Sequence, residues 1–235
     1  MEKLGQLYEG KAKKVFATSD PALCIVSYKD DATAFNGKKK GTIEGKGVVN
    51  NKMSNYLMAQ MEKEGIPTHF VKELSDRDTL VKKVQIVPLE VIVRNVAAGS
   101  FSKRFGVAEG TPLLAPTLEF CYKCDALDDP MCNEYHIIAC GWATREDLDR
   151  ITELTFRIND FLLRFFKGIR VDLIDFKIEF GKTADGTILL ADEISPDTCR
   201  LWDAETHEKL DKDRFRRDLG NVEGAYQEMM KRIFS

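Results

Sequence analysis

Three carboxylates and one lysine between positions 175 and 192 have the types and spacing expected of a site that binds a metal ion and phosphate. Asp175, Lys177 and Glu179 alternate with apolar residues, and Asp192 follows beyond a turn. Successive side chains of a strand point to opposite faces, so the first three would share one face. The opposite, apolar face would carry Ile174, Phe176, Ile178 and Phe180.

The dipeptide Asp185-Gly186 predicts a two-residue hairpin turn, because such turns need positive φ at their central positions. That turn would set Ala184 opposite Thr187 and therefore Glu179 opposite Asp192. Directly opposed carboxylates lie about 5 Å apart and repel each other unless a cation compensates them. Mg²⁺ prefers carboxylate oxygen and keeps open positions for phosphates, so the pair predicts a metal-phosphate site. The alternative is a solvated edge at which both acids point into water.

A second group with suitable chemistry is Gly10-Lys11-Ala12-Lys13, between two expected short strands. Strand alternation would place Lys11 and Lys13 on the same side, where two ammonium groups could hold phosphates. Lysine pairs are also common on solvated surfaces, which is the alternative. Together with the carboxylate pair, the lysines supply what phosphoryl transfer requires, namely cations and a bridging metal.

Composition limits the class of protein. The chain has 235 residues, of which 43% are hydrophobic and 31% charged, with a net charge of −3. This predicts one large globular domain or two small lobes, and no nucleic-acid or membrane partner. Residues 1–6 lack the apolar core of a signal peptide, and no apolar run approaches the roughly 20 residues of a membrane span. A cytoplasmic location is therefore expected.

Six cysteines are too few for a disulfide scaffold in a chain of this length. Cys121, Cys124, Cys132 and His136 could instead form a zinc site, although Asp128-Asp129-Pro130 between them suits a turn equally well. Reduced thiols are the simpler interpretation.

Patterns along the chain predict the elements that must position these groups. Strands are expected within 6–28 and at 69–74, 79–84 and 88–95, and helices at 48–64, from 101 or 102, from 144 to 168 and from 212 to the end. Residues 30–47, rich in Lys, Gly and Thr, are expected to form a mobile loop. Clustered early strands predict an α+β fold with largely antiparallel sheets and flanking helices.

The segment 85–88 is expected to be a hinge that divides the chain into an N-terminal lobe, 1–86, and a C-terminal lobe, 87–235. Beyond it, Arg94 precedes small residues and a helix start, an arrangement that could bind an anion at the helix N-terminus. Plain capping of that helix by Ser100 is the alternative.

Motifs along nearly the whole chain resemble the SAICAR synthetase family, also called phosphoribosylaminoimidazole-succinocarboxamide synthases. The motifs are Leu7-Tyr8-Glu9-Gly10-Lys11-Ala12-Lys13, residues 87–95, Ala97-Ala98-Gly99-Ser100, residues 175–181, residues 192–203 and Lys212-Asp213-Arg214-Phe215-Arg216. The resemblance implies a ligase of purine biosynthesis that joins L-aspartate to carboxyaminoimidazole ribonucleotide and converts ATP to ADP and phosphate. It also implies a two-lobed fold related to ATP-grasp enzymes and kinases, and a homodimer.

The resemblance further implies roles for individual residues. Gly10, Lys11, Ala12, Lys13, Val15 and Lys123 would surround ATP, with adenine against Lys82 and Val84. Glu179 and Asp192 would hold Mg²⁺, and Glu44 and Asp175 a second Mg²⁺. Arg94, Ser100 and Arg200 would bind the 5′-phosphate of the ribonucleotide, and Lys177 would lie between the substrates. Lys11, Lys123, Asp175 and Lys177 are the expected catalytic residues.

One departure from the family pattern lies at Asn36, where many relatives carry Asp, so a carboxylate role is lost there. Two other functions are open to the same residues. One is a kinase-like phosphotransferase acting on a small alcohol, and the other is a regulatory module that binds ATP without turning it over.

Overall fold

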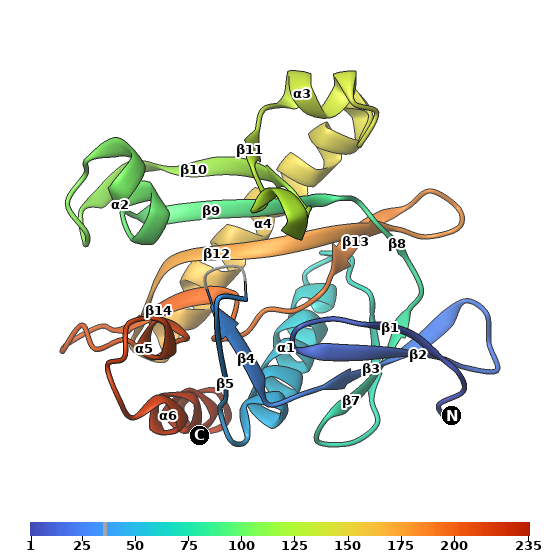
Figure 1. Ribbon diagram of the computed structural model, residues 1–235, viewed down its shortest axis with the longest axis horizontal. Helices are drawn as coiled ribbons and strands as arrows, with labels where there is room; N and C mark the ends of the chain where they lie inside the picture. The colour runs from blue at the N-terminus through green and yellow to red at the C-terminus, as the bar shows by residue number, and fades with distance from the viewer. Residues whose placement is uncertain (35–36) are drawn as a thin grey trace.

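The computed structural model describes residues 1–34 and 37–235, so the expectation for Asn36 lies outside the described residues. The chain forms antiparallel sheets flanked by helices (Figure 1), which confirms the expected α+β class.

Residues between Gln6 and Lys82 form a five-stranded antiparallel sheet. Its order is β1 (Gln6–Glu9), β2 (Lys13–Ala17), β3 (Leu23–Tyr28), β7 (Asp78–Lys82) and β6 (Phe70–Glu73). The expected strands in this part of the chain are therefore confirmed within a few residues.

The segment 30–47 is not the irregular loop that we expected, because it contains a two-stranded hairpin, and its mobility stays a prediction. Strand β4 (Asp31–Ala34) pairs with β5 (Lys39–Thr42), and helix α1 (Lys46–Lys63) follows. A distant contact holds the hairpin, since Lys39 Nζ donates to Phe215 O and Asp218 Oδ1, both at 2.6 Å. The Lys-rich sequence shows no strand alternation, and the stabilising contact comes from a distant part of the chain. The hairpin could therefore not be predicted from the local sequence.

A seven-stranded sheet makes up most of the rest. Its main path is β11 (Met131–Cys132), β10 (Pro112–Tyr122), β9 (Leu89–Val96), β12 (Val171–Lys182) and β13 (Ile188–Ala191), and β8 (Gln85–Ile86) and β14 (Cys199–Asp203) both pair with β12. The expected hinge therefore begins with a short strand, β8, that is hydrogen-bonded to β12. Sheet membership changes between Lys82 and Gln85, and the lobe boundary after residue 86 stays a prediction.

The remaining helices are α2 (Gly99–Phe105), a 3₁₀ turn η1 (Asp125–Leu127), α3 (Glu134–Ala139), α4 (Arg145–Gly168), α5 (Asp213–Arg216) and α6 (Val222–Phe234). Thr144 and Asp147 form the capping box expected at the start of α4. Helix α4 crosses behind the large sheet, and α1 and α6 pack together below it (Figure 1). No helix of the described chain is long and apolar enough to cross a membrane.

One large core joins these layers. Met53 and Leu57 of α1, Ile158 of α4 and Phe176 and Phe180 of β12 are all buried in it. Ile174 was expected on the same face as Phe176 but packs in a separate cluster with Ala98 and Trp202. The cause is a register shift between Leu173 and Asp175, opposite β14, which turns Ile174 to the other side.

The expected register of the β12–β13 hairpin is wrong by one residue. Glu179 pairs with Ala191 rather than with Asp192. The loop has three residues instead of two, since Thr183 N donates to Thr187 O at 3.1 Å and Gly186 has a φ of 86°. This geometry is that of a type I turn followed by a left-handed glycine, the common three-residue alternative.

Candidate active site

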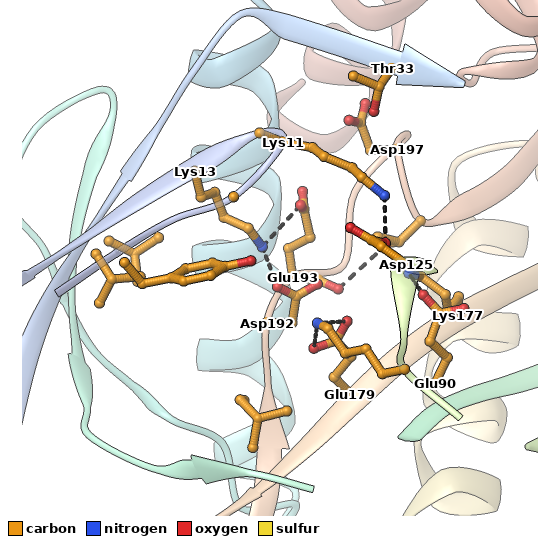
Figure 2. Close-up of a pocket in the computed structure, with 18 of the residues that line it drawn as sticks. Lys11, Lys13, Thr33, Glu90, Asp125, Lys177, Glu179, Asp192, Glu193 and Asp197 are labelled. Atoms are coloured by element: carbon orange, nitrogen blue, oxygen red, sulfur yellow. Dashed lines mark hydrogen bonds and ion pairs between the residues drawn. The ribbon is translucent and has the colours of Figure 1, made fainter. Parts of the chain in front are cut away.

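A cleft of about 820 Å³ lies between the two large sheets (Figure 2). Every residue that we expected to contact ATP lines it: Gly10, Lys11, Ala12, Lys13, Val15, Lys82, Val84, Lys123, Glu179 and Asp192. Lys177 lines it as well. The structure thus brings together groups that are up to 182 residues apart in the sequence, from Gly10 to Asp192.

One part of the cleft is apolar. Val15, Val26, Val81, Val84 and Ile86 line it, and they come from β2, β3, β7, β8 and the link between β7 and β8. His69 lies beside them, and burial together with the nearby Lys13 lowers the pKa of its imidazole to about 4. The imidazole is therefore neutral at physiological pH, and this part of the cleft suits a flat, uncharged group.

Glu179 and Asp192 meet in the cleft even though they are not paired across the hairpin. Asp192 follows β13 with a φ of 60°, a left-handed conformation that is uncommon for residues other than Gly. This backbone turn redirects its side chain, which Figure 2 shows near Glu179. Non-glycine residues in this region often mark functional sites.

The two carboxylates interact electrostatically. Burial and the charge of Asp192 raise the pKa of Glu179 above its ordinary value. Burial would also raise the pKa of Asp192, but Lys13 and Lys123 outweigh it and hold that pKa at about 2. The two carboxylates therefore lie close together, and the neighbouring lysines compensate their repulsion only in part.

Two lysines from distant parts of the chain contact these acids. Lys13 of β2 contacts Asp192, reaches Glu193 Oε1 at 3.0 Å and lies 5.4 Å from the ring centre of Tyr28. Burial disfavours its charge, yet Asp192 and Glu193 hold the pKa of Lys13 well above the ordinary value. Lys123 Nζ contacts both carboxylate oxygens of Glu179 at 2.5 Å.

Two further lysines that line the cleft have acidic partners. Lys11 Nζ lies 2.7 Å from Asp125 Oδ1, and Lys177 pairs with Glu90 of β9. Burial would lower the pKa of Lys177, but Glu90 and Glu179 raise it above its ordinary range. Lys177 is therefore a cation at neutral pH.

The Glu179–Asp192 pair has the chemistry of a Mg²⁺ site. Both ligands are hard oxygen donors, both lie in the cleft, and their mutual repulsion is what a divalent cation would relieve. Lys13 and Lys123 form ion pairs with these two acids, so cations already compensate part of their charge. The residues present therefore fit the metal.

A second charged cluster, beside the cleft, contains the residues expected to bind the ribonucleotide phosphate. Arg94 is only 3% exposed and donates to Glu119 at 2.9 Å, to Asp175 Oδ2 at 2.8 Å and to Ser100 Oγ at 3.1 Å. Arg200 Nη1 donates to the same Asp175 oxygen at 2.7 Å. Arg94, Ser100 and Arg200 thus come together as expected, around Asp175.

The geometry excludes capping of α2 by Ser100 and does not test the expected second metal site. Ser100 does not cap α2, because the helix begins at Gly99 with Ala98 as its N-cap, and Ser100 lies in the first turn. The short polar side chain of Ser100 instead accepts from Arg94. Asp175 is neutralised by two guanidinium groups, while Glu44 is exposed and is not among the described residues that line the cleft. The second Mg²⁺ at Glu44 and Asp175 stays a prediction.

Asp213 links Arg200 to the C-terminal segment and should contribute to stability in acid. Its carboxylate accepts from Arg200 Nε at 2.9 Å and Arg216 Nη1 at 2.7 Å. Burial opposes the charge, but these arginines lower the pKa of Asp213 from 3.8 to about 2. A lowered folded-state pKa contributes stability that is present above pH 3.8 and lost as pH falls toward 2.

Replacing Asp213 by Asn is therefore expected to lower the free energy of unfolding by about 2 kcal/mol near pH 6. The difference from the parent chain should shrink toward zero near pH 2. Urea unfolding at a series of pH values measures this, and a difference that is constant with pH would contradict it.

Several residues of the cleft were not identified from the sequence pattern. Asp197 is almost fully buried and accepts from Tyr226 at 2.6 Å, Lys46 at 3.0 Å and Lys212 at 3.1 Å. Glu90 and Glu193 were missed as partners of Lys177 and Lys13. Glu90 shares a strand face with Arg94, a signal that could have placed it at the site, whereas the partners of Asp197 are too distant in sequence to be paired by spacing.

The cysteine cluster does not form the zinc site that we considered. All six cysteines are described and carry free thiols. Within the described part of the chain, no group of three or more His, Cys, Asp or Glu side chains could hold a metal ion. Glu179 and Asp192 are only two side chains, so they do not count as such a group.

Comparison with known proteins agrees with this architecture. The sequence profile of the SAICAR synthetase family matches residues 6–233. A phosphoribosylaminoimidazole-succinocarboxamide synthase from Lachnoclostridium phytofermentans is 65% identical over 233 residues, covering 99% of each chain. One of the same name from Deinococcus radiodurans is 62% identical and covers 96% of this chain and 95% of its own.

Solved structures give the same result. A phosphoribosylaminoimidazole-succinocarboxamide synthase from Ehrlichia chaffeensis superposes with a TM-score of 0.95 at 49% identity, covering 97% of this chain and 98% of its own. A SAICAR synthetase in complex with ADP superposes with a TM-score of 0.94 at 45% identity, covering 97% of each chain.

Proposed function

The chain belongs to the SAICAR synthetase family, and from this premise we propose that it joins L-aspartate to the carboxylate of 5-amino-1-(5-phosphoribosyl)imidazole-4-carboxylate, with conversion of ATP to ADP and phosphate. Family membership carries the role of a ligase in purine biosynthesis. One observation most supports the proposed substrates and the use of ATP. Lysines and two close carboxylates share a cleft, and a buried arginine cluster lies next to it.

The cleft suggests how ATP would lie. Its apolar part, near Lys82 and Val84, would take adenine, and the lysines Lys11, Lys13 and Lys123 would face the phosphates. The relative solved with ADP supports the use of a nucleotide. In this orientation, the base would contact apolar side chains and the phosphates would contact lysines.

Glu179 and Asp192 would hold Mg²⁺ in this arrangement. When bound, Mg²⁺ would neutralise phosphate charge that builds up during transfer. Lys13 and Lys123, released from their carboxylates, would add to the same neutralisation. The residues therefore serve both the metal and the phosphates.

The arginine cluster would receive the 5′-phosphate of the imidazole ribonucleotide. Arg94 is fixed by Glu119 and Asp175, so it would hold the phosphate in one orientation. Lys177 lies on the same strand as Asp175 and also lines the cleft, which supports a position for it between this cluster and the ATP phosphates. Glu90 holds the ammonium group in that position.

The reaction needs an activated carboxylate, because a carboxylate at neutral pH is a poor electrophile. We propose that the imidazole carboxylate attacks the γ-phosphorus of ATP, forming an acyl phosphate and releasing ADP. The unprotonated amine of aspartate then attacks the acyl carbon and expels phosphate. Lys177, kept protonated by Glu90, would stabilise the negative charge in both steps.

An ADP-release assay in which each substrate is omitted in turn tests the function. The expected result is ADP formation that requires both the imidazole carboxylate and aspartate. Steady ADP formation with a small alcohol and without aspartate would support a kinase-like phosphotransferase instead. ATP binding with no turnover under any condition would support a regulatory module.

The acyl phosphate makes its own prediction. With ATP labelled by ¹⁸O at the β,γ-bridge and the imidazole carboxylate present, label should scramble into the β-nonbridging positions without aspartate. Mass spectrometry of recovered ATP measures the exchange. Absence of scrambling while the β-phosphate can rotate counts against a reversible acyl phosphate.

A homodimer, a cytoplasmic location, a second Mg²⁺ at Glu44 and Asp175 and the lobe boundary at residue 86 also remain part of the proposal.

A further inference from the structure

Asp211 is a fully buried acid that joins two elements next to the arginine cluster. Its Oδ2 accepts from the backbone N–H of Leu201 at 2.8 Å, and its Oδ1 accepts from the backbone N–H of Asp213 at 2.7 Å. Leu201 belongs to β14 and Asp213 begins α5. One carboxylate therefore ties the strand to the first turn of the helix.

The surrounding hydrogen bonds show why this tie is made by a side chain. Lys209 forms an antiparallel bridge with Trp202, and Leu210 N donates to Leu201 O at 2.7 Å. The chain thus runs along β14 until Asp211, whose carboxylate replaces a backbone carbonyl as the acceptor for Leu201. Strand pairing ends there, and the backbone is free to turn into α5.

The position of Arg200 depends on this junction. Arg200 lies directly before Leu201, and its Nε donates to Asp213 Oδ2 at 2.9 Å. Its other side is fixed by Asp175 at 2.7 Å. Space is narrow, because a Cβ added to Gly99 would lie 2.4 Å from Arg200 Nη2. A small shift between β14 and Asp213 would therefore move the guanidinium against α2.

Holding an ionised acid at this place is unfavourable for the fold. Burial and the neighbouring Asp213 raise the pKa of Asp211 to about 7, in spite of its two backbone donors. The other ionisable groups that act on it or feel its charge are Arg216 of α5, Arg200 and Cys199 of β14 and Tyr226 of α6. Asp211 therefore does not stabilise the fold through its charge. Its carboxylate instead fixes the geometry of the junction between β14 and α5.

We propose that Asp211 is a positioning residue for the substrate phosphate, which holds Arg200 beside Arg94 and Ser100 without itself touching the substrate. This inference rests on the proposed function, because it takes the ribonucleotide phosphate as the group that Arg200 receives.

The test is the Asp211→Asn variant of the full chain. Asparagine has the same shape, but its amide nitrogen must face one of the two backbone N–H groups, so one hydrogen bond is lost. The KM for the imidazole ribonucleotide should rise about tenfold or more, while the KM for ATP stays within about twofold. This selective change in one KM would not follow from a general loss of structure.

Asp203→Asn is a matched control. Asp203 also lies on β14, and its Oδ1 accepts from the backbone N–H groups of Glu205 at 2.9 Å and Thr206 at 2.7 Å. It has no role in the proposed site, so the KM for the ribonucleotide should equal that of the parent chain.

An unchanged ribonucleotide KM in Asp211→Asn would overturn the inference, as would an equal rise in both KM values. Should that variant not fold, Asp213→Asn must show the same selective rise, because it removes the charge that holds Arg200. Binding of ribose 5-phosphate, measured by calorimetry, needs no turnover and should weaken in the same variants. If the parent chain fails to convert the imidazole carboxylate, the proposed function fails, and equal binding of ribose 5-phosphate by parent and variant would separately reject the role of Asp211.

Discussion

Replacing Glu179 by Gln is expected to lower kcat for ADP formation by about a thousandfold, while the protein remains folded. The carboxamide keeps the shape of the side chain but removes one of the two charges that would hold Mg²⁺. Burial and Asp192 raise the pKa of Glu179, so its ionised form is unfavourable in the folded chain. The melting temperature of the variant should therefore be equal to or higher than that of the parent chain.

Asp172→Asn is the matched control for this prediction. Asp172 lies on the same strand, β12, but is exposed to solvent. Its replacement should leave kcat unchanged. The assignment of Glu179 to the metal would be contradicted by a kcat within a few-fold of the parent value at low Mg²⁺ concentration.

Replacing Lys177 by Met is expected to lower kcat by about a thousandfold with little change in nucleotide binding. Met has a similar length and can lie in the same space, but it supplies no positive charge between the carboxylate and the γ-phosphate. Glu90 and Glu179 hold Lys177 as a cation, and its side chain is not part of the apolar lining to which we assign adenine. Rapid-quench kinetics for chemistry and calorimetry with ADP for binding measure the two effects separately.

Lys167→Met serves as a control, because this lysine lies exposed in the last turn of α4. A loss of ADP affinity in Lys177→Met as large as the loss in kcat would show that the lysine only binds nucleotide. A regulatory module without turnover would show no chemistry to lose in either variant.

The Glu179–Asp192 pair illustrates how two residues can be correctly predicted to meet while the predicted local geometry is wrong. The sequence pattern correctly indicated a hairpin and the meeting of Glu179 with Asp192. It did not reveal the three-residue loop or the left-handed backbone of Asp192. These two departures compensate each other, because the register shift moves Asp192 off the pairing position and the backbone turn brings its side chain back to the cleft.

Other parts could not be predicted because they depend on contacts across the chain. The β4–β5 hairpin is fixed by Lys39 reaching Phe215 and Asp218, and its own sequence has no strand pattern. Asp197 accepts a hydrogen bond from Lys46, which lies 151 residues away in the sequence. By contrast, α4 could be predicted almost to the residue, since its capping box and its apolar periodicity are both local.

A crystal structure with ADP and Mn²⁺, in which anomalous scattering locates the metal, tests most directly whether Glu179 and Asp192 bind the metal. We expect an anomalous peak within about 2.2 Å of carboxylate oxygens of both Glu179 and Asp192, in contact with the β-phosphate. A peak bound elsewhere, with Lys13 and Lys123 still covering the two acids, would contradict it.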